Sequence, residues 1–360
     1  MVQQEEFDER FSKAPTEEEL DHLRETRNLF KSNLLKLEID ELLSHVQQVP
    51  SKKMQVSIRE YLVDLKTFLE GMKEKKNVKG FKIETGFDED ILLNFAPCVD
   101  VSVVGSFMVD SMLRAHKNID VALTIPSSCF DSKDYLNKRY FQKRAAYLWC
   151  VAKALQKNAD LATDVSFAAF NGDCDKPVIV ITPGDHLKDY TIRLLPVIED
   201  DVFPIRRFGP RLNNFEGGFK APTPHYSMSI LEDISSASVG SHLKILNHVT
   251  EKAKSFSDVC LLLKVWAKQR GFTKDQSADT FNGFLLVMLA ARLIVRKQIN
   301  EHTSPQQMFK SVIGFIAKTD FFTEAIHMSN DAPDSGKFLI KKANDEQTLH
   351  TSQWAMMCQK

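Results

Sequence analysis

The sequence predicts an α/β domain built around one mixed sheet, followed by an all-α domain and preceded by a helical extension. Between residues 99 and 198, short β-branched runs surround a long stretch of helical periodicity. Residues 204–226 are rich in Pro and Gly without periodicity, as in a linker, and helical spacing then continues to about residue 318. The predicted divisions are an extension (1–82), an α/β domain (83–203), a linker (204–226) and a helical domain (227–360).

The 360-residue chain is long enough for two domains, and its 43% apolar and 26% charged residues are typical of globular proteins. Its net charge of −1 excludes attraction to nucleic acid by the whole molecule, so any such contact requires a local basic surface. Six widely spaced cysteines without a C-x-x-C pair favour neither a zinc site nor disulfides. With no secretory signal and no apolar run of membrane-spanning length, we expect a soluble intracellular protein that binds no membrane.

The extension contains two predicted helices and a basic segment. Thr16 and Glu19 form a capping box for the first helix, residues 16–47, and the second helix covers residues 54–72. Residues 73–82, KEKKNVKGFK, follow as a flexible basic connector. A solvated connector is the simpler interpretation, and a contact with nucleic acid is the alternative.

The elements of the two domains follow from their periodicity. In the α/β domain, the predicted strands are 99–104, 120–125, 165–170, 177–182 and 190–198, and the predicted helices are 107–114 and 133–157. In the helical domain, the predicted helices are 239–251, 255–270, 280–298 and 305–318. Ser304 and Pro305 mark the start of the last one as N-cap and first-turn proline. The expected core between the second and third helices contains Leu262, Leu263, Trp266, Phe284, Leu285 and Leu289.

A Gly-Ser turn ends the first strand of the α/β domain, and an acid follows on the next strand. At Gly105 and Ser106, backbone amides could approach a triphosphate, because glycine has no side chain to block it. Nucleotidyl transfer also needs two metal ions about 3.5–4 Å apart, and carboxylate oxygens are their natural ligands. An acid-x-acid pair on one strand and a third acid on a neighbouring strand usually supply these ligands.

This chain has one of those three acids. Asn118 stands at the first position and Asp120 at the second, while the strand expected to carry the third acid has Arg193 there, which would compete for Asp120. One carboxylate cannot hold two divalent ions, so we predict no metal, no cofactor and no nucleotidyl transfer. The alternative is an ordinary strand–turn–helix in which Gly105 merely serves the turn.

Four segments resemble a known family. The segment CLLLKVWAKQRGF (260–272) resembles the helical domain of poly(A) polymerases and oligoadenylate synthetases. Together with NIDVALTIP (118–126), KDYLNKRYFQKRAAYL (133–148) and APTPHYSMSILED (221–233), it resembles the Nrap family, the nucleolar RNA-associated proteins of the small-subunit processome. The resemblance implies a degenerate nucleotidyltransferase-like domain followed by a poly(A)-polymerase-like helical domain. Because family members are much longer, it also implies a fragment or an incomplete gene model.

The resemblance implies a function as well, that of a non-catalytic scaffold in ribosome biogenesis. Its location would be the nucleus and nucleolus. Its partners would be precursor ribosomal RNA, small-subunit processome proteins and small nucleolar ribonucleoprotein. Two alternatives remain open: an active RNA nucleotidyltransferase, and a protein-only adaptor without RNA contact.

The candidate RNA-binding surface combines two basic segments. On the predicted 133–157 helix, the charges opposite the apolar stripe are expected to point outward, with Arg139 and Lys143 neighbours at i and i+4. The alternative is that these side chains only solvate a helix and a connector. The candidates are Lys138, Arg139, Lys143, Arg144, Lys75, Lys76, Lys79 and Lys82.

Overall fold

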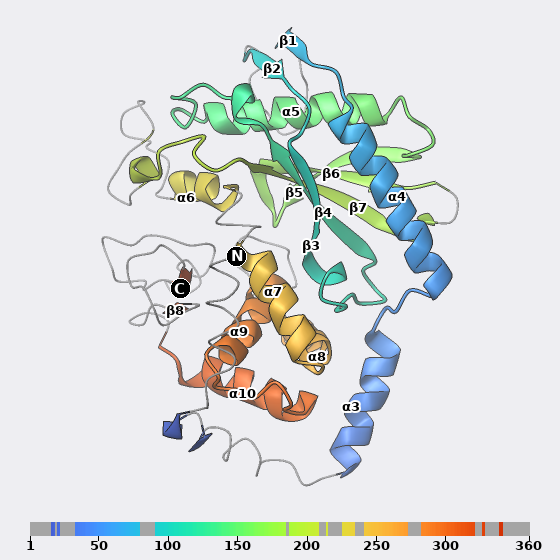
Figure 1. Cartoon of the computed structure of the whole chain (residues 1–360), viewed down its shortest axis with the longest axis vertical. Coiled ribbons are helices and arrows are strands. Elements are labelled where there is room, and N and C mark those ends of the chain that lie inside the picture. Colours follow the sequence, from blue (N-terminus) through green and yellow to red (C-terminus); the bar gives the residue numbers. More distant parts are fainter. Residues whose placement is uncertain are drawn as a thin grey trace.

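The structure is a computed structural model of the 360-residue chain. It describes residues 16–18, 20–21, 33–79, 91–184, 187–208, 214, 225–234, 241–272, 282–320, 326–327 and 338–340. Within these residues, a sheet with its flanking helices and a group of helices below it form the two main hydrophobic cores (Figure 1). The predicted α/β domain followed by a helical domain is confirmed.

The sheet has the strand order β3-β4-β7-β6-β5. β4 and β7 pair in parallel and the other neighbours are antiparallel, so the predicted mixed sheet is confirmed. Because β4 and β7 are the second and third of the five strands, their apolar side chains, such as Leu123 and Leu194, are fully buried. The bounds are β3 Asp100–Val104, β4 Asn118–Ile125, β5 Asp164–Phe170, β6 Asp173–Thr182 and β7 Thr191–Ile198.

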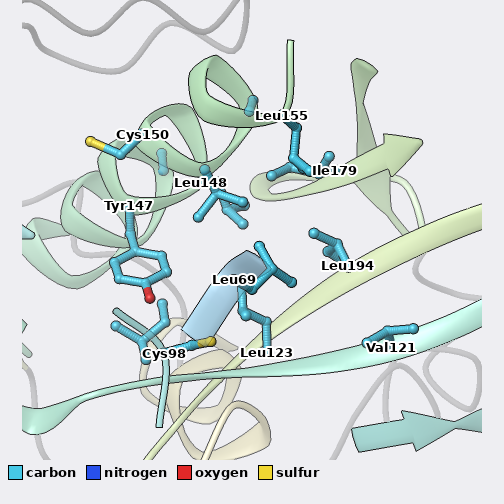
Figure 2. Packing of buried hydrophobic residues seen from close by; sticks show 14 of the residues in the cluster. Leu69, Cys98, Val121, Leu123, Tyr147, Leu148, Cys150, Leu155, Ile179 and Leu194 are labelled. Atoms are coloured by element: carbon cyan, nitrogen blue, oxygen red, sulfur yellow. The ribbon is translucent and has the colours of Figure 1, made fainter. Parts of the chain in front are cut away.

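Two helices pack on the sheet: α5 (Arg139–Leu155) and α4 (Lys52–Glu70). Figure 2 shows Leu148 of α5 gathered with Ile179 of β6 and Leu69 of α4 in one apolar cluster. The apolar residues of α5 that face this cluster are the ones whose spacing predicted a helix in residues 133–157. Short 3-10 turns connect the elements, at Gly105–Phe107 (η1), Ser127–Cys129 (η2) and Ile205–Phe208 (η4).

The helical domain contains α7 Ser241–Lys252, α8 Phe256–Gln269, α9 Gly283–Val295 and α10 Pro305–Lys318. Residues 285–294 of α9 are buried all round because α7, α8 and α10 pack against it. The predicted start of α10 is confirmed, since the Ser304 side chain accepts a hydrogen bond from the Gln307 amide at 3.5 Å. Two core predictions are wrong: Phe284 is 47% exposed, and Trp266 is only partly buried at the edge of the core.

The predicted helix over residues 107–114 is absent. After η1, Asp110 adopts a left-handed backbone with φ of 48°, which interrupts any helix. The Met112 carbonyl accepts from the Gln48 amide at 2.8 Å, and the Arg114 amide donates to the Val46 carbonyl at 2.9 Å. Backbone groups that a helix would pair internally therefore pair with the last residue of α3 (Asn33–Val46) and with the connector between α3 and α4.

The extension differs from prediction in two places. Residues 19 and 22–32 lie outside the described residues, so the continuous 16–47 helix stays a prediction beyond α3. The connector prediction for 73–82 is wrong in part, because β1 (Lys75–Val78) pairs antiparallel with β2 (Leu93–Phe95). No helix in the described ranges is long and apolar enough to cross a membrane.

The segment just after the predicted linker packs with the sheet. It forms α6 (His225–Glu232), and Ile230 and Ile234 are buried in the core shared by the sheet and α5. The predicted boundary after residue 226 assigns this segment to the helical domain instead. Beyond α10, a two-stranded sheet pairs β8 (Ile326–His327) with β9 (Phe338–Ile340).

Candidate functional site

The Gly-Ser turn lies directly beside the acid of β4. β3 ends at Val104, which pairs with Asp120 in the antiparallel register, so the turn that follows must pass the Asp120 side chain. Gly105 has a φ of +74°, in the left-handed region that favours glycine. A Cβ at this position would also lie 2.8 Å from Asp120 Oδ2. Backbone angle and lack of space therefore both require glycine here.

Asp120 is held by Arg193. The parallel register of β4 and β7 places the two residues opposite each other. Arg193 Nε donates to Asp120 Oδ1 at 2.6 Å, and Nη2 donates to Oδ2 at 2.9 Å. The aspartate side chain is 13% exposed and the arginine side chain 34% exposed. This two-bond pairing occupies both carboxylate oxygens of Asp120.

Neither Asn118 nor Asp164 brings a second carboxylate to Asp120. Asn118, two residues before it, is opposite Thr191 and supplies a neutral amide. Asp164 begins β5, which is separated from β4 by β7 and β6. Among the residues that the structure describes, no group of three or more His, Cys, Asp or Glu side chains is placed to hold a metal ion.

The helical domain contacts the loop that follows the turn. Lys264 of α8 donates from Nζ to both the carbonyl oxygen and Oγ of Ser111, each at 2.8 Å. Ser257 Oγ donates to the Asp110 carbonyl at 2.6 Å. Burial lowers the pKa of Lys264 to about 8, although the nearby Cys260 and Asp120 act to raise it. In the sequence, the segment containing Lys264 indicated only a family resemblance and a core between two helices. This contact between the domains was not predicted.

Two of the RNA-binding candidates are buried. Lys143 lies 2.7 Å from Asp131 Oδ2 and 2.5 Å from Asp134 Oδ2. Arg144 is 1% exposed and donates to Asp233 Oδ2 at 2.9 Å. The expectation that both side chains point outward is wrong, because the loop before α5 and the end of α6 cover this side of the helix. The helical periodicity of α5 predicted its apolar stripe. It could not show that the side carrying Lys143 and Arg144 is covered as well.

Asp233 is a structural residue that sequence reasoning missed. It accepts hydrogen bonds from Tyr140 at 2.8 Å and Arg144 at 2.9 Å, and its other oxygen lies 3.0 Å from Lys176 Nζ. Lys176 also donates to the Ser229 carbonyl at 2.9 Å. These buried contacts join the end of α6 to α5 and β6. The residues in these contacts are spread from 140 to 233 in the sequence, so no local pattern predicts the contacts.

The remaining candidates differ in exposure. Lys138 forms an ion pair with Asp175 at 2.7 Å, with both side chains about two-fifths exposed. Arg139 on α5 is exposed, as are Lys75, Lys76 and Lys79 in or beside β1. Lys82 lies outside the described residues.

The fold and this site define a class: a mixed α/β domain with an arginine bound to the acid of a central strand, followed by a helical domain. Residues 63–252 match Nrap protein domain 1, and residues 255–357 match the Nrap protein PAP/OAS-like domain. The chain belongs to the Nrap family. The predicted family and fold class are thereby confirmed.

Similar proteins include curated relatives and solved structures. The chain is 34% identical to Nucleolar protein 6 of Mus musculus over 349 residues, and 33% identical to that of Homo sapiens over 345 residues. These matches cover 89% and 88% of this chain but only 29% of each relative, so the chain spans less than a third of their length. A structure of E. coli MS115-1 CdnC with ATP is similar at a TM-score of 0.48 and 18% identity, covering 83% of this chain and 76% of that one.

Proposed function

We propose that this chain is a non-catalytic, RNA-binding scaffold that acts in ribosome biogenesis. The observation that carries the non-catalytic part is the two-bond pairing of Arg193 with Asp120. Two magnesium ions need several hard oxygen ligands, and the arginine occupies both oxygens of the one acid in the nucleotidyl-transfer position. The residues present do not fit a two-metal centre.

Charge supports the same conclusion. A divalent cation approaching Asp120 would have to displace the guanidinium, which is already close enough to neutralise the carboxylate. The neighbouring Asn118 brings no compensating negative charge. The Gly-Ser turn therefore serves the fold, by letting the chain pass beside this ion pair.

The curated relatives are nucleolar proteins by name, in agreement with the predicted nuclear and nucleolar localisation. A role in ribosome biogenesis follows from this kinship. The proposed partners are precursor ribosomal RNA, small-subunit processome proteins and small nucleolar ribonucleoprotein. Since the net charge is −1, RNA contact must use local basic surfaces, and the exposed candidates Arg139, Lys75, Lys76 and Lys79 supply them.

Primer extension tests the non-catalytic part. The purified chain is incubated with an RNA primer and each NTP, in magnesium or manganese, and no extension is expected. Extension that disappears in Asp120→Ala but persists in Asp164→Ala would overturn the proposal, because Asp164 is an exposed aspartate far from the turn. RNA affinity at low salt tests the scaffold part, and a chain that binds no RNA would instead be a protein-only adaptor.

A further inference from the structure

We propose that the outer face of α5, together with Lys75 of β1, binds single-stranded RNA, with Trp149 as a stacking platform for a base. This inference rests on the proposed RNA-binding function and locates it. The proposed surface leaves out the earlier candidates Lys143 and Arg144, which are buried, and uses residues that are accessible to solvent.

The outer face of α5 is basic and contains no acid. From Lys138 to Lys157 the sequence has no Asp or Glu. Trp149 and Lys153 are four residues apart, so they are neighbours on one side of α5, and Lys157 follows four residues later in the turn after the helix. At about 1.5 Å per residue, the stretch of α5 from Arg139 to Lys153 is about 21 Å long. From Lys138 to Lys157 the exposed side chains include Arg139, Lys153 and Lys157, and Trp149 is partly exposed among them.

These cations are available to a ligand. In the described part of the chain, no carboxylate forms an ion pair with Arg139, Lys153 or Lys157, whereas Lys138 and Lys143 are paired with aspartates. Near the start of α5, Lys138 and Lys143 are paired, and Asp131 also lies close enough to Arg139 to interact with its charge. Lys153 and Lys157 lie further along and have no such partner among the described residues. Such local positive charge on a chain of net charge −1 suits a polyanion that follows the helix.

Trp149 adds an aromatic surface to these charges. Lys153 Nζ lies 5.9 Å from the centre of its ring, one helical turn away. A base could stack on the indole while the flexible lysine moves to the adjacent phosphate. Stacking on an aromatic side chain requires an unpaired base, because bases in a duplex are stacked on each other. An aromatic ring between regularly spaced cations therefore favours single-stranded RNA over a duplex or an acidic peptide.

The β1–β2 hairpin extends this surface. Lys75 pairs with Phe95 across the hairpin, and its Nζ lies 5.9 Å from the centre of that ring. Phe95 in turn lies 4.8 Å from Tyr147 of α5, measured between ring centroids. This chain of contacts places Lys75 beside the helix, and Figure 1 shows the hairpin next to α5 at the top of the molecule. Glu74 is the acid nearest in sequence to Lys75, and it is exposed.

The test measures binding of labelled oligouridylate and of an RNA duplex of equal length by fluorescence anisotropy over a range of salt. Lys153→Ala with Lys157→Ala should weaken oligouridylate binding and reduce the slope of log affinity against log salt by about 1.4, at about 0.7 per phosphate contact. The matched control is Lys244→Ala with Lys252→Ala, two exposed lysines of α7, which should change neither. Trp149→Ala should weaken oligouridylate binding roughly 5- to 150-fold and leave duplex binding nearly unchanged.

Trp149→Phe keeps an aromatic ring and should restore most of the affinity, which separates stacking from loss of fold. Oligouridylate should also quench intrinsic fluorescence in the parent chain but less in Trp149→Phe. Parent-like binding by the α5 variants would overturn this inference and leave the RNA-binding function at another surface. Equal losses for duplex and single strand, or equal competition by polyglutamate, would overturn the single-stranded assignment. If the parent chain binds no RNA at low salt, both proposals fail.

Discussion

Replacement of Gly105 by alanine tests the architecture of the candidate site. The left-handed φ of +74° costs a residue with a Cβ about 1–2 kcal/mol. The new Cβ would lie 2.8 Å from Asp120 Oδ2, and the carboxylate cannot retreat without stretching its bonds to Arg193. Weakening one charged hydrogen bond adds about 1–2 kcal/mol, at the low end because the arginine is partly exposed. The expected total is about 2–4 kcal/mol.

Urea and thermal unfolding followed by circular dichroism measure this cost. It corresponds to a melting temperature lowered by about 4–16 °C for a domain of this size. The Asp120→Ala background removes the clash, so Gly105→Ala should there cost only the backbone share of about 1–2 kcal/mol. Ser106→Ala is the control and should change stability by less than about 0.5 kcal/mol. Equal costs in both backgrounds would refute the steric argument, and a Gly105→Ala variant as stable as its parent would refute the turn itself.

Three further predictions concern residues away from the turn. Asp233→Ala removes the carboxylate that pairs with the buried Arg144 and Lys176. The free energy of unfolding measured in urea should fall by about 3–5 kcal/mol. A change below about 1 kcal/mol would contradict the burial of this network. Trp266→Ala should cost less than the roughly 3–5 kcal/mol of a fully buried tryptophan, because the side chain is only partly buried; a larger loss in thermal melts would place it in the core. The pKa of Lys264 is lowered to about 8 in the folded chain, so the unfolded chain binds more protons than the folded chain between pH 8 and 10. The unfolding free energy of the parent relative to Lys264→Met should therefore rise with pH over that range. A difference that does not change with pH would contradict the lowered pKa.

Local signals predicted much of the fold. The last helix of the bundle was correct at both ends, because a serine cap, a first-turn proline and an apolar stripe all lie within its own residues. The central strands were correct to within a few residues, since β-branched runs bounded by turns are also local. The residue types at the candidate site, Asn118, Asp120 and Arg193, could be read directly from the chain.

Three features depended on partners distant in sequence. Residues 107–114 were expected to be helical, but their backbone pairs with the end of α3 and the connector that follows it. Lysines of the 73–82 segment joined a strand because residues 93–95 lie alongside it. Lys143 and Arg144 were expected outside, but an amphipathic pattern shows which face is apolar and not whether loops cover the polar one.

By itself, the sequence determined the order of the two domains, the family and the chemical identity of the residues at the candidate site. Only the tertiary structure decided that Arg193 holds both oxygens of Asp120, that Lys264 joins the helical domain to the loop after the turn, and which cations of α5 reach solvent. The physical reason is that residue type and short-range periodicity are properties of one segment. Strand register, ion pairing and burial arise between segments, and the energy that fixes them is gained only when the chain has folded.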